Sequence, residues 1–430
     1  MNENFVNFHV LISHSPSCLN RDDMNMQKSA IFGGKRRVRV SSQSLKRTMR
    51  NSNYYKQHFP ERSIRTRELG LLIETLADEL ACGGYEVEKH WIEKAVQVFS
   101  SKTLAGEEDN EEENSDDVSQ EDYSEAPTKK VAVAPWAVSE FKFLCDNVIR
   151  VYQQELTDKE KDALQKAIEK ENSRKPTKKK PKKSSDEIKD EFLLKKLKKE
   201  LEADSAGLLK ACGNAIDMAL SGRMATSGLM SNITGALAVA HAITTHAVDA
   251  DIDWFTAVDD LQELGSGHLD TQEFSSGVFY RYASLNLKQL QVNLGLLSDI
   301  KAEETAEGRA KALEIAAHVL HMLATEVPSA KQQSFAAHNL ADLALVSFSH
   351  QPISLANAFE KPVQSDYKTG GFREPSITVL NSHWDKIHRG YGLQERCSEF
   401  ALDEVSLPND IAAKPSLPAL ENWIRTNGQG

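Results

Sequence analysis

The chain has 430 residues, with 52 Lys or Arg against 63 Asp or Glu, and a formal net charge of −11. Its 40% hydrophobic and 27% charged residues are typical of a globular protein, with a length suited to about two or three domains. No apolar run reaches the roughly 18 residues that a transmembrane helix needs, so we expect none.

The negative charge comes from one segment. Residues 107–125 hold 11 carboxylates and no base, and the rest of the chain has equal numbers of acids and bases. This composition predicts disorder, so the net charge does not exclude a nucleic-acid partner. The tract is either a tolerated surface insertion or a segment that screens basic residues until RNA or a neighbouring subunit displaces it. We favour the insertion.

In chain order, the first predicted element is a strand at 5–13, with Phe8, Val10 and Ile12 on one face. A short helix is predicted at 41–50. Further helical segments are expected at 66–100 (two helices, broken at 82–84), 135–170, 186–201 and 206–220, with a basic, proline-containing linker at 173–183.

The second half adds strands at 236–246, 276–286 and 343–348, and a helix at 308–326. In the second strand Val278, Tyr280 and Tyr282 share a face. Without the helical insertion the order is βαββαβ. The sequence therefore predicts an α+β protein with a ferredoxin-like, RNA-recognition type of sheet.

Cysteine and histidine spacings point to no cofactor, no metal and no catalytic residue. The five cysteines are scattered and form no CxxC pair, which is typical of reduced thiols in a cytoplasmic protein. None of the close histidine pairs belongs to an HExxH motif, so they are interpreted as core or surface residues. They are His9 with His14, His241 with His246, and His318 with His321.

The strongest local signal is a basic segment at 24–60, which contains nine Lys or Arg and no acid. Within it, the expected helix places Gln43, Lys46, Arg47 and Arg50 on one face, opposite the apolar residues of the helix.

The start of this helix is a candidate phosphate site. Ser41 or Ser42 can cap it, and exposed N–H groups at a helix start favour an anion. We interpret the cationic face as a binding surface for a sugar-phosphate backbone. The alternative is an ordinary charged helix surface.

A second signal is Trp254, Phe255 and Thr256, which could stack on bases or wedge between them. Packing of the two rings in a core is the interpretation that the residues alone favour. The nearby carboxylates leave a different class of function open, a metal-dependent nuclease. They are Asp249, Asp251, Asp253, Asp259 and Asp260.

A third signal is a lysine-rich helix. Together with the linker bases it could form a basic arm for sequence-independent nucleic-acid contact, or it could be a solvated charged face. The lysines are Lys195, Lys196, Lys198 and Lys199.

The run HVLISHSPSCLNRDDMNMQKSAIFGGKRRVRVSSQSLKRTMR, residues 9–50, closely resembles the N-terminus of the CasC family, the backbone subunit of the type I-E CRISPR Cascade surveillance complex. The likeness continues through 219–228, 240–263, 271–283, 321–332 and 356–363.

This resemblance implies an RNA-recognition palm with a helical fingers insertion and a thumb loop. Copies would stack as a helical filament along the guide RNA (crRNA) and display its bases to target DNA, beside other Cascade subunits. The subunit would not be an enzyme, because a separate recruited nuclease-helicase cuts the DNA. The implied palm covers 1–60, 236–247 and 276–430, the fingers 61–235 and the thumb 248–275.

The resemblance also implies residue roles. Trp254, Phe255 and Thr256 would kink the guide at intervals, which changes our preference from core packing to a wedge. Met224 would lie against the RNA, and the four lysines of the basic helix would contact target DNA. The RNA backbone would be held by Arg21, Lys28, Ser41, Gln43, Lys46, Arg47 and Arg50.

Overall fold

The computed structural model describes residues 3–59, 61–66, 68–105, 134–174, 182–224, 232–258, 266–368, 370–404, 406–408 and 410–429. The acidic tract at 107–125 and most of the basic linker at 173–183 lie outside these residues. The chain forms two compact units. The first comprises Met1–Pro60, Gly235–Val292 and Leu296–Gly430, and the second comprises Glu61–Thr234 and Asn293–Gly295.

The first unit is built on a large mixed sheet in the order β12-β11-β10-β1-β9-β7-β3-β2, and both β6 and β8 also pair with β9. Neighbouring strands run antiparallel except β11 and β12, which are parallel. The strands are β1 (Phe5–Ser17), β2 (Ser29–Phe32), β3 (Lys35–Val40), β6 (Leu237–Val239), β7 (Ala242–Thr244), β8 (Asp251–Val258), β9 (Ser266–Asn286), β10 (Leu343–Ser349), β11 (Arg396–Ala401) and β12 (Ile411–Lys414).

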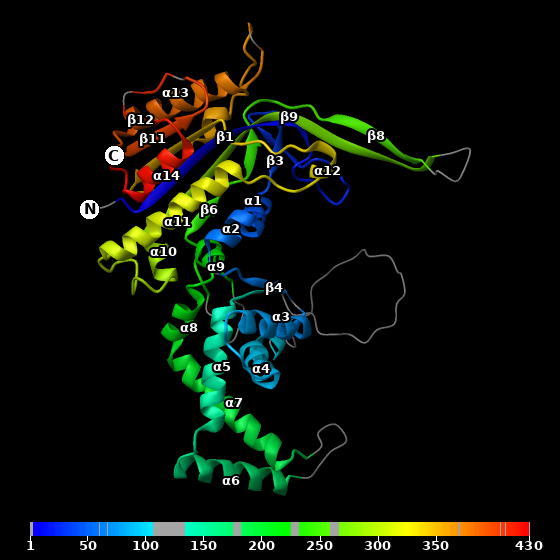
Figure 1. Cartoon of the computed structure of the whole chain (residues 1–430), viewed down its shortest axis with the longest axis vertical. Helices are drawn as coiled ribbons and strands as arrows, with labels where there is room; N and C mark the ends of the chain where they lie inside the picture. The colour runs from blue at the N-terminus through cyan, green and yellow to red at the C-terminus, as the bar shows by residue number, and fades with distance from the viewer. Residues whose placement is uncertain are drawn as a thin grey trace. The chain divides into compact units, whose positions relative to one another are not determined.

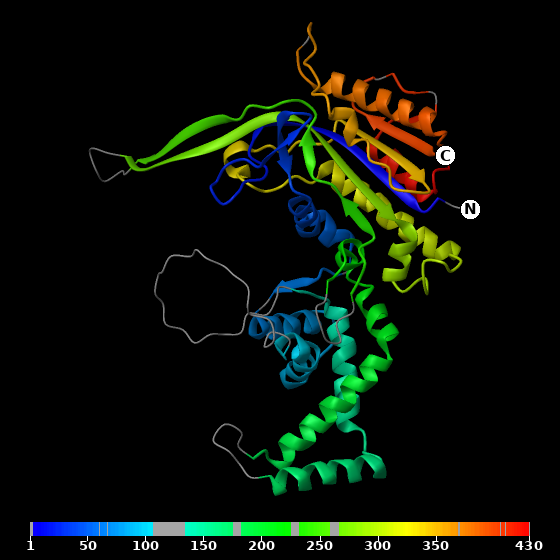
Figure 2. The ribbon, with the colours of Figure 1, turned by 180° about the vertical axis from the view of Figure 1, so that it is seen from behind.

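Helices cover both faces of this sheet (Figures 1 and 2), with α13 on one face and α11 and α14 on the other. The helices of the unit are α1 (Ser42–Asn51), α2 (Asn53–His58), α10 (Leu287–Asn293), α11 (Ala306–Thr325), α12 (Gln332–Phe335), the 3₁₀ helix η1 (Ala356–Phe359), α13 (Arg373–Tyr391) and α14 (Leu417–Arg425). The last residue of α10, Asn293, belongs to the second unit.

The side chains of β10 alternate between the two faces of the sheet and pack in the apolar layers on both. Leu343 and Leu345 join Trp384 of α13 in one apolar cluster. On the opposite face Phe348 contacts Trp423 of α14, with ring centroids 5.3 Å apart. Because neighbouring side chains in a strand point to opposite faces, a strand between two helical layers is buried on both faces. Every residue of β10 is buried accordingly.

The single strand predicted at 236–246 is wrong, because the structure divides it into β6 and β7. Leu237 pairs with Leu285, whereas Ile243 pairs with Tyr280, so the register with β9 shifts by one residue between them. An extra residue on one strand of an antiparallel pair is a β-bulge, which bends the strand. The segment therefore makes two short strands along β9.

The strand predicted at 343–348 is confirmed as β10, but it does not end the sheet. β11 pairs with β10 and β12 pairs with β11, so two further strands from the C-terminal part of the chain extend that side.

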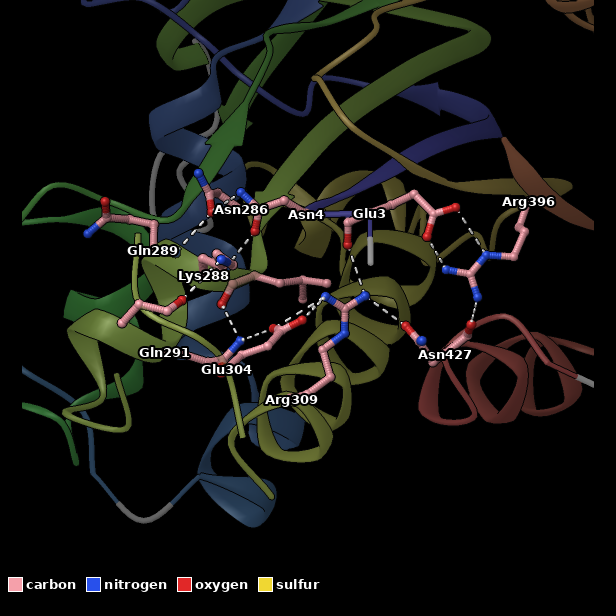
Figure 3. A network of polar contacts seen from close by, with 12 residues as sticks. Glu3, Asn4, Asn286, Lys288, Gln289, Gln291, Glu304, Arg309, Arg396 and Asn427 are labelled. Atoms are coloured by element: carbon pink, nitrogen blue, oxygen red, sulfur yellow. Dashed lines mark hydrogen bonds and ion pairs between the residues drawn. The ribbon is translucent and has the colours of Figure 1, made fainter. Parts of the chain in front are cut away.

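A polar network holds the start of β1 against three other elements (Figure 3). Arg309 of α11 donates to the main-chain oxygen of Glu3 at 2.9 Å and to the side-chain oxygen of Asn427 at 2.7 Å. It also contacts Glu304 at 3.2 Å. Arg396 forms an ion pair with the Glu3 carboxylate. These charge-assisted contacts join α11, β11 and the residues after α14 to the N-terminal segment.

The second unit is mostly helical around one apolar cluster that includes Leu76, Phe99, Phe141 and Leu197. Its elements are β4 (Ile64–Thr66), α3 (Leu69–Cys82), α4 (Lys89–Ala105), β5 (Ala134–Trp136), α5 (Val138–Gln153), α6 (Asp158–Ser173), α7 (Ser185–Ala203), α8 (Ser205–Cys212) and α9 (Ile216–Ser221).

The one helical stretch predicted at 135–170 is wrong, because it comprises β5, α5 and α6. The break before α6 has a local cause. The main-chain N–H of Thr157 donates to the Glu160 carboxylate at 2.9 Å, which begins a new helix at this point.

No helix within the described ranges is long and apolar enough to cross a membrane. All five cysteines are free thiols, four of them buried.

Candidate nucleic-acid interface

The predicted helix at 41–50 is confirmed as α1, and its two faces differ as expected. Leu45 and Met49 are buried against the unit, while Gln43 and Arg47 are exposed. Lys46 and Arg50 are half-buried beside them. The apolar pair fixes the rotation of the helix, so the cationic face is directed outward.

The start of α1 is less open than expected. Ser41 is the N-cap and its hydroxyl accepts from the N–H of Ser44 at 3.3 Å. The N–H of Ser42 donates to Nδ1 of His241 at 3.3 Å. These two N–H groups have acceptors within the protein, and phosphate binding at the start of the helix stays a prediction. The side chains of the helix, rather than its first N–H groups, carry the basic character.

A β-hairpin that the sequence analysis missed precedes α1. β2 and β3 pair antiparallel through a turn at Gly33 and Gly34, both at positive φ (57° and 70°). The Gly-Gly pair between two short apolar or basic runs is a signal for such a hairpin and could have predicted it. Lys35 and Arg36 are exposed beyond the turn, and Arg36 lies 3.6 Å from the Glu273 carboxylate.

One cation of the basic segment is structural. Arg37 is fully buried, and its guanidinium donates to the main-chain oxygens of Thr244 and Phe359, each at 2.9 Å, and of Glu360 at 3.2 Å. It ties β3 to β7 and to the end of η1. The nine cations of the segment therefore do not all belong to one binding surface.

The loop carrying Arg21 and Lys28 lies beside α1. Asn20 accepts from the N–H of Ser41 at 2.9 Å, and the N–H of Arg39 on β3 donates to the Lys28 oxygen at 2.9 Å. Arg21 is exposed and its guanidinium donates to Asn25. The structure thus brings Arg21 and Lys28 to the same part of the unit as α1.

Trp254 is on a long two-stranded ribbon, formed by β8 and the first half of β9, that extends from the sheet (Figure 1). It is 65% exposed, and Ile252, two residues before it, is 57% exposed. The core packing that the residues alone favoured is therefore wrong for Trp254. Phe255 and Thr256 pair through their main chains with Asp270 and Leu269. Their side chains lie outside the described part of the structure.

The remaining predicted site residues are in the second unit. Met224 is 88% exposed. On α7, Lys195 and Lys199 are exposed, whereas Lys196 forms an ion pair with Glu160 of α6 at 2.8 Å. This ammonium and the N–H of Thr157 hold the pKa of the Glu160 carboxyl at about 2. Lys196 therefore joins α7 to α6. The exposed positive charge of α7 comes from Lys195 and Lys199.

Three of the five carboxylates considered for a nuclease are described by the structure, and they form no metal-binding group there. Asp249, Asp251 and Asp253 are exposed and belong to no group of three possible metal ligands among the described residues. Asp259 and Asp260 lie outside those residues. Nothing described here supports a metal-dependent nuclease centre.

The chain is similar to a known protein family and to chains of known structure. The model of the CT1975-like protein family matches residues 6–423. A solved chain of a "CRISPR RNA-guided surveillance complex, pre-nicking" is similar with a TM-score of 0.66 and 26% identity, covering 99% of this chain and 100% of that chain. A chain of a "CRISPR RNA-guided surveillance complex" has a TM-score of 0.53 at 20% identity, with the same coverage, and shares the fold. No curated protein matches the chain.

Proposed function

The chain belongs to the CT1975-like protein family, and we propose on this basis that it is a guide-RNA-binding subunit of a Cascade-type CRISPR surveillance complex. The solved chains that it resembles over 99% of its length belong to CRISPR RNA-guided surveillance complexes. The observation that carries the proposal is the outward cationic face of α1 in a segment of 37 residues without an acid.

We further propose the finer role of a type I-E, CasC-like backbone subunit, in which copies assemble along the RNA. The strand order β10-β1-β9-β7 supports an RNA-recognition palm. Arg21, Lys28, Arg47 and the other residues around α1 would contact phosphates. Such contacts are independent of base sequence, as a subunit that accepts any guide requires.

The exposed ribbon of β8 and β9 supports a second proposed contact, in which an aromatic side chain stacks on the RNA bases. An indole that is not packed in a core can stack on a base or separate two bases, and stacking is tolerant of sequence. Trp254 would supply this surface, with Phe255 and Thr256 following it on β8. The guide bases between two such contacts would be left for pairing with target DNA.

Co-expression with a CRISPR RNA tests the proposal. We expect the purified protein to carry RNA and native mass spectrometry to give several copies per RNA. The double variant Lys46→Ala with Arg50→Ala should weaken RNA binding, and its salt slope should fall by about 1.4 because two phosphate contacts to a single strand are lost.

The matched control is Lys301→Ala with Lys311→Ala, which removes two exposed cations elsewhere in the same unit. It should leave both affinity and slope unchanged. An RNA-free protein, or equal effects of the two double variants, would contradict the proposal. Incubation of the complex with divalent metal should leave RNA and DNA intact. Cleavage that Asp251→Ala abolishes would instead favour the nuclease.

A further inference from the structure

Three different metal-binding side chains meet at the sheet edge opposite the β2–β3 hairpin. His388 is in the last turn of α13, Glu395 immediately precedes β11, and Cys397 is on β11 (Figure 1). Their ligand atoms all lie within 4.8 Å of one another. His388 and Cys397 are buried and Glu395 is half-buried. None of the three takes part in the candidate nucleic-acid interface.

The orientation of His388 is fixed by α13 itself. Its Nδ1 is 2.9 Å from the main-chain oxygen of Trp384, one turn earlier. A carbonyl oxygen only accepts, so Nδ1 carries the hydrogen. The imidazole also stacks on the Trp384 indole, with ring centroids 3.8 Å apart. In the neutral ring, Nε2 is therefore the atom with the free lone pair.

That lone pair faces a carboxylate. Nε2 of His388 is 3.2 Å from Oε2 of Glu395. Two acceptors at this distance repel each other unless a positive charge lies between them or one of them is protonated. The two atoms are therefore bridged either by a proton or by a metal ion.

Cys397 supplies a possible third ligand. A proton joins only the imidazole and the carboxylate, and leaves the Cys397 thiol as a member of the apolar cluster around Trp384. A metal ion uses the sulfur as its third ligand. Burial and the neighbouring Glu395 carboxylate raise the pKa of the Cys397 thiol. Metal binding must therefore displace the thiol proton, as it does for other buried cysteine ligands.

The three donors select a class of metal. Imidazole nitrogen, thiolate sulfur and carboxylate oxygen together suit Zn²⁺ and similar divalent ions, with bonds of about 2.0 to 2.3 Å. A cavity of about 600 Å³ is lined by all three residues and by the exposed Asp410. This space leaves water access to a fourth coordination position.

We propose that His388, Glu395 and Cys397 bind one divalent metal ion of the zinc class. The sequence pattern predicts no metal here, because the spacing His388-x₆-Glu395-x-Cys397 matches no common motif. The ion would join the end of α13 to β11 across the turn at Gly392, which has a φ of 60°. Free metal would stabilise the unit by mass action.

Titration of the metal-free full-length protein with Co²⁺ tests the site. We expect one ion per chain by metal analysis after gel filtration. The absorption spectrum should contain a thiolate-to-cobalt charge-transfer band and the visible bands of a four-coordinate ion. Cys397→Ser should remove the charge-transfer band, and His388→Gln should weaken binding at least tenfold. Excess Zn²⁺ should displace the cobalt and raise the Tm of the wild type.

The matched control is Cys82→Ser, because Cys82 is the exposed thiol of the chain. This variant should bind Co²⁺ like the wild type. A charge-transfer band that survives Cys397→Ser but disappears in Cys82→Ser would overturn the proposal. So would a folded wild type that retains no metal through gel filtration. Should Cys397→Ser fail to fold, an unchanged cobalt affinity of the folded His388→Gln protein would overturn it equally.

Discussion

The guanidinium of Arg37 donates to the main-chain oxygen of Thr244 at 2.9 Å, inside the most basic segment of the chain. The same side chain reaches the oxygens of Phe359 and Glu360. A buried cation held by three carbonyl groups connects strands of the sheet, and it cannot at the same time contact a phosphate. The basic segment therefore contains both structural and exposed cations. Removing a structural cation should lower the stability of the protein, whereas removing an exposed one should weaken RNA binding.

Replacing Arg37 by Ala should lower the free energy of unfolding by about 3 kcal/mol, because it leaves buried carbonyl oxygens without a donor. Urea denaturation followed by circular dichroism measures this loss. The control is Arg47→Ala on the exposed face of α1, which should change stability by less than about 0.5 kcal/mol and weaken RNA binding instead. An Arg37→Ala protein of wild-type stability with weak RNA binding would contradict this assignment.

Replacing Trp254 by Ala should leave stability within about 0.5 kcal/mol of the wild type, because the indole is largely exposed. In the proposed function, RNA binding should weaken by about 1 to 3 kcal/mol through the loss of stacking. Fluorescence anisotropy with a labelled RNA measures the affinity.

Two variants sharpen the test of Trp254. Trp254→Phe keeps an aromatic face and should retain most of the binding. Ile252→Ala removes an exposed apolar side chain from the same face of β8 and should have little effect, because Ile252 offers no ring. Equal losses for Trp254→Ala and Ile252→Ala would indicate a general apolar contact rather than stacking.

Short-range patterns predicted the central part of the fold. β1, β9 and β10 contain buried apolar runs, and α1 separates charged from apolar residues at helical spacing. The β2–β3 hairpin also has a short-range signal, the Gly33-Gly34 turn. α13 also has one, because Ile377, Leu380 and Trp384 recur at helical spacing and are buried.

Other features depend on partners far away in the sequence. Arg36 and Arg37 are neighbours of the same type, yet one is exposed and the other is buried, because Thr244 and Phe359 supply acceptors only after folding. Ile252 and Trp254 alternate with aspartates as the buried side of a strand does. None of the described residues covers them, and alternation alone cannot reveal this.

Acid should destabilise the protein partly through His14. The ring is buried, with Nδ1 3.3 Å from Asn339 and Nε2 3.4 Å from the Arg281 guanidinium. Burial and the Arg281 charge lower its pKa to about 3, from about 6.5 in an unfolded chain. Between these values the unfolded state binds more protons, so stability is full above pH 6.5 and falls as the pH decreases toward 3.

The variant His14→Gln should remove this part of the acid sensitivity, since a neutral amide can contact both Asn339 and Arg281. From pH 7.5 to 4.5 the wild type should lose about 2 to 3 kcal/mol more than the variant, measured by urea denaturation at each pH. His350→Gln, at an exposed position, should lose as much as the wild type. Parallel pH profiles for His14→Gln and the wild type would show that another group dominates.

On α7, the exposed lysines and the paired lysine should behave differently. Lys195 and Lys199 are one helical turn apart on the same side, so their replacement by Ala should weaken target-DNA binding in the proposed function. Lys196→Ala removes an ion pair with Glu160 and should leave DNA affinity unchanged. Electrophoretic mobility shifts of the assembled complex measure both effects. A larger loss with Lys196→Ala than with the exposed pair would contradict the proposed DNA contact.

The second unit contains a fully buried ion pair whose removal should be costly. Arg223 donates to both oxygens of Glu140, at 2.7 and 2.9 Å, and the two side chains are 0% and 1% exposed. Arg223→Ala leaves a buried carboxylate without its partner and should destabilise the unit by about 3 to 5 kcal/mol. Urea denaturation, followed through near-ultraviolet circular dichroism, measures the change.

Two further sets of variants are controls for Arg223→Ala. Replacing both residues together, as Arg223→Met with Glu140→Leu, should recover most of the lost stability, because no unpaired charge remains. Arg150 and Glu200 form an ion pair of similar length, 2.7 Å, on the surface of the same unit. Arg150→Ala should cost at most about 1 kcal/mol, since water screens an exposed pair. Equal losses for Arg150→Ala and Arg223→Ala would mean that burial does not set the strength of these contacts.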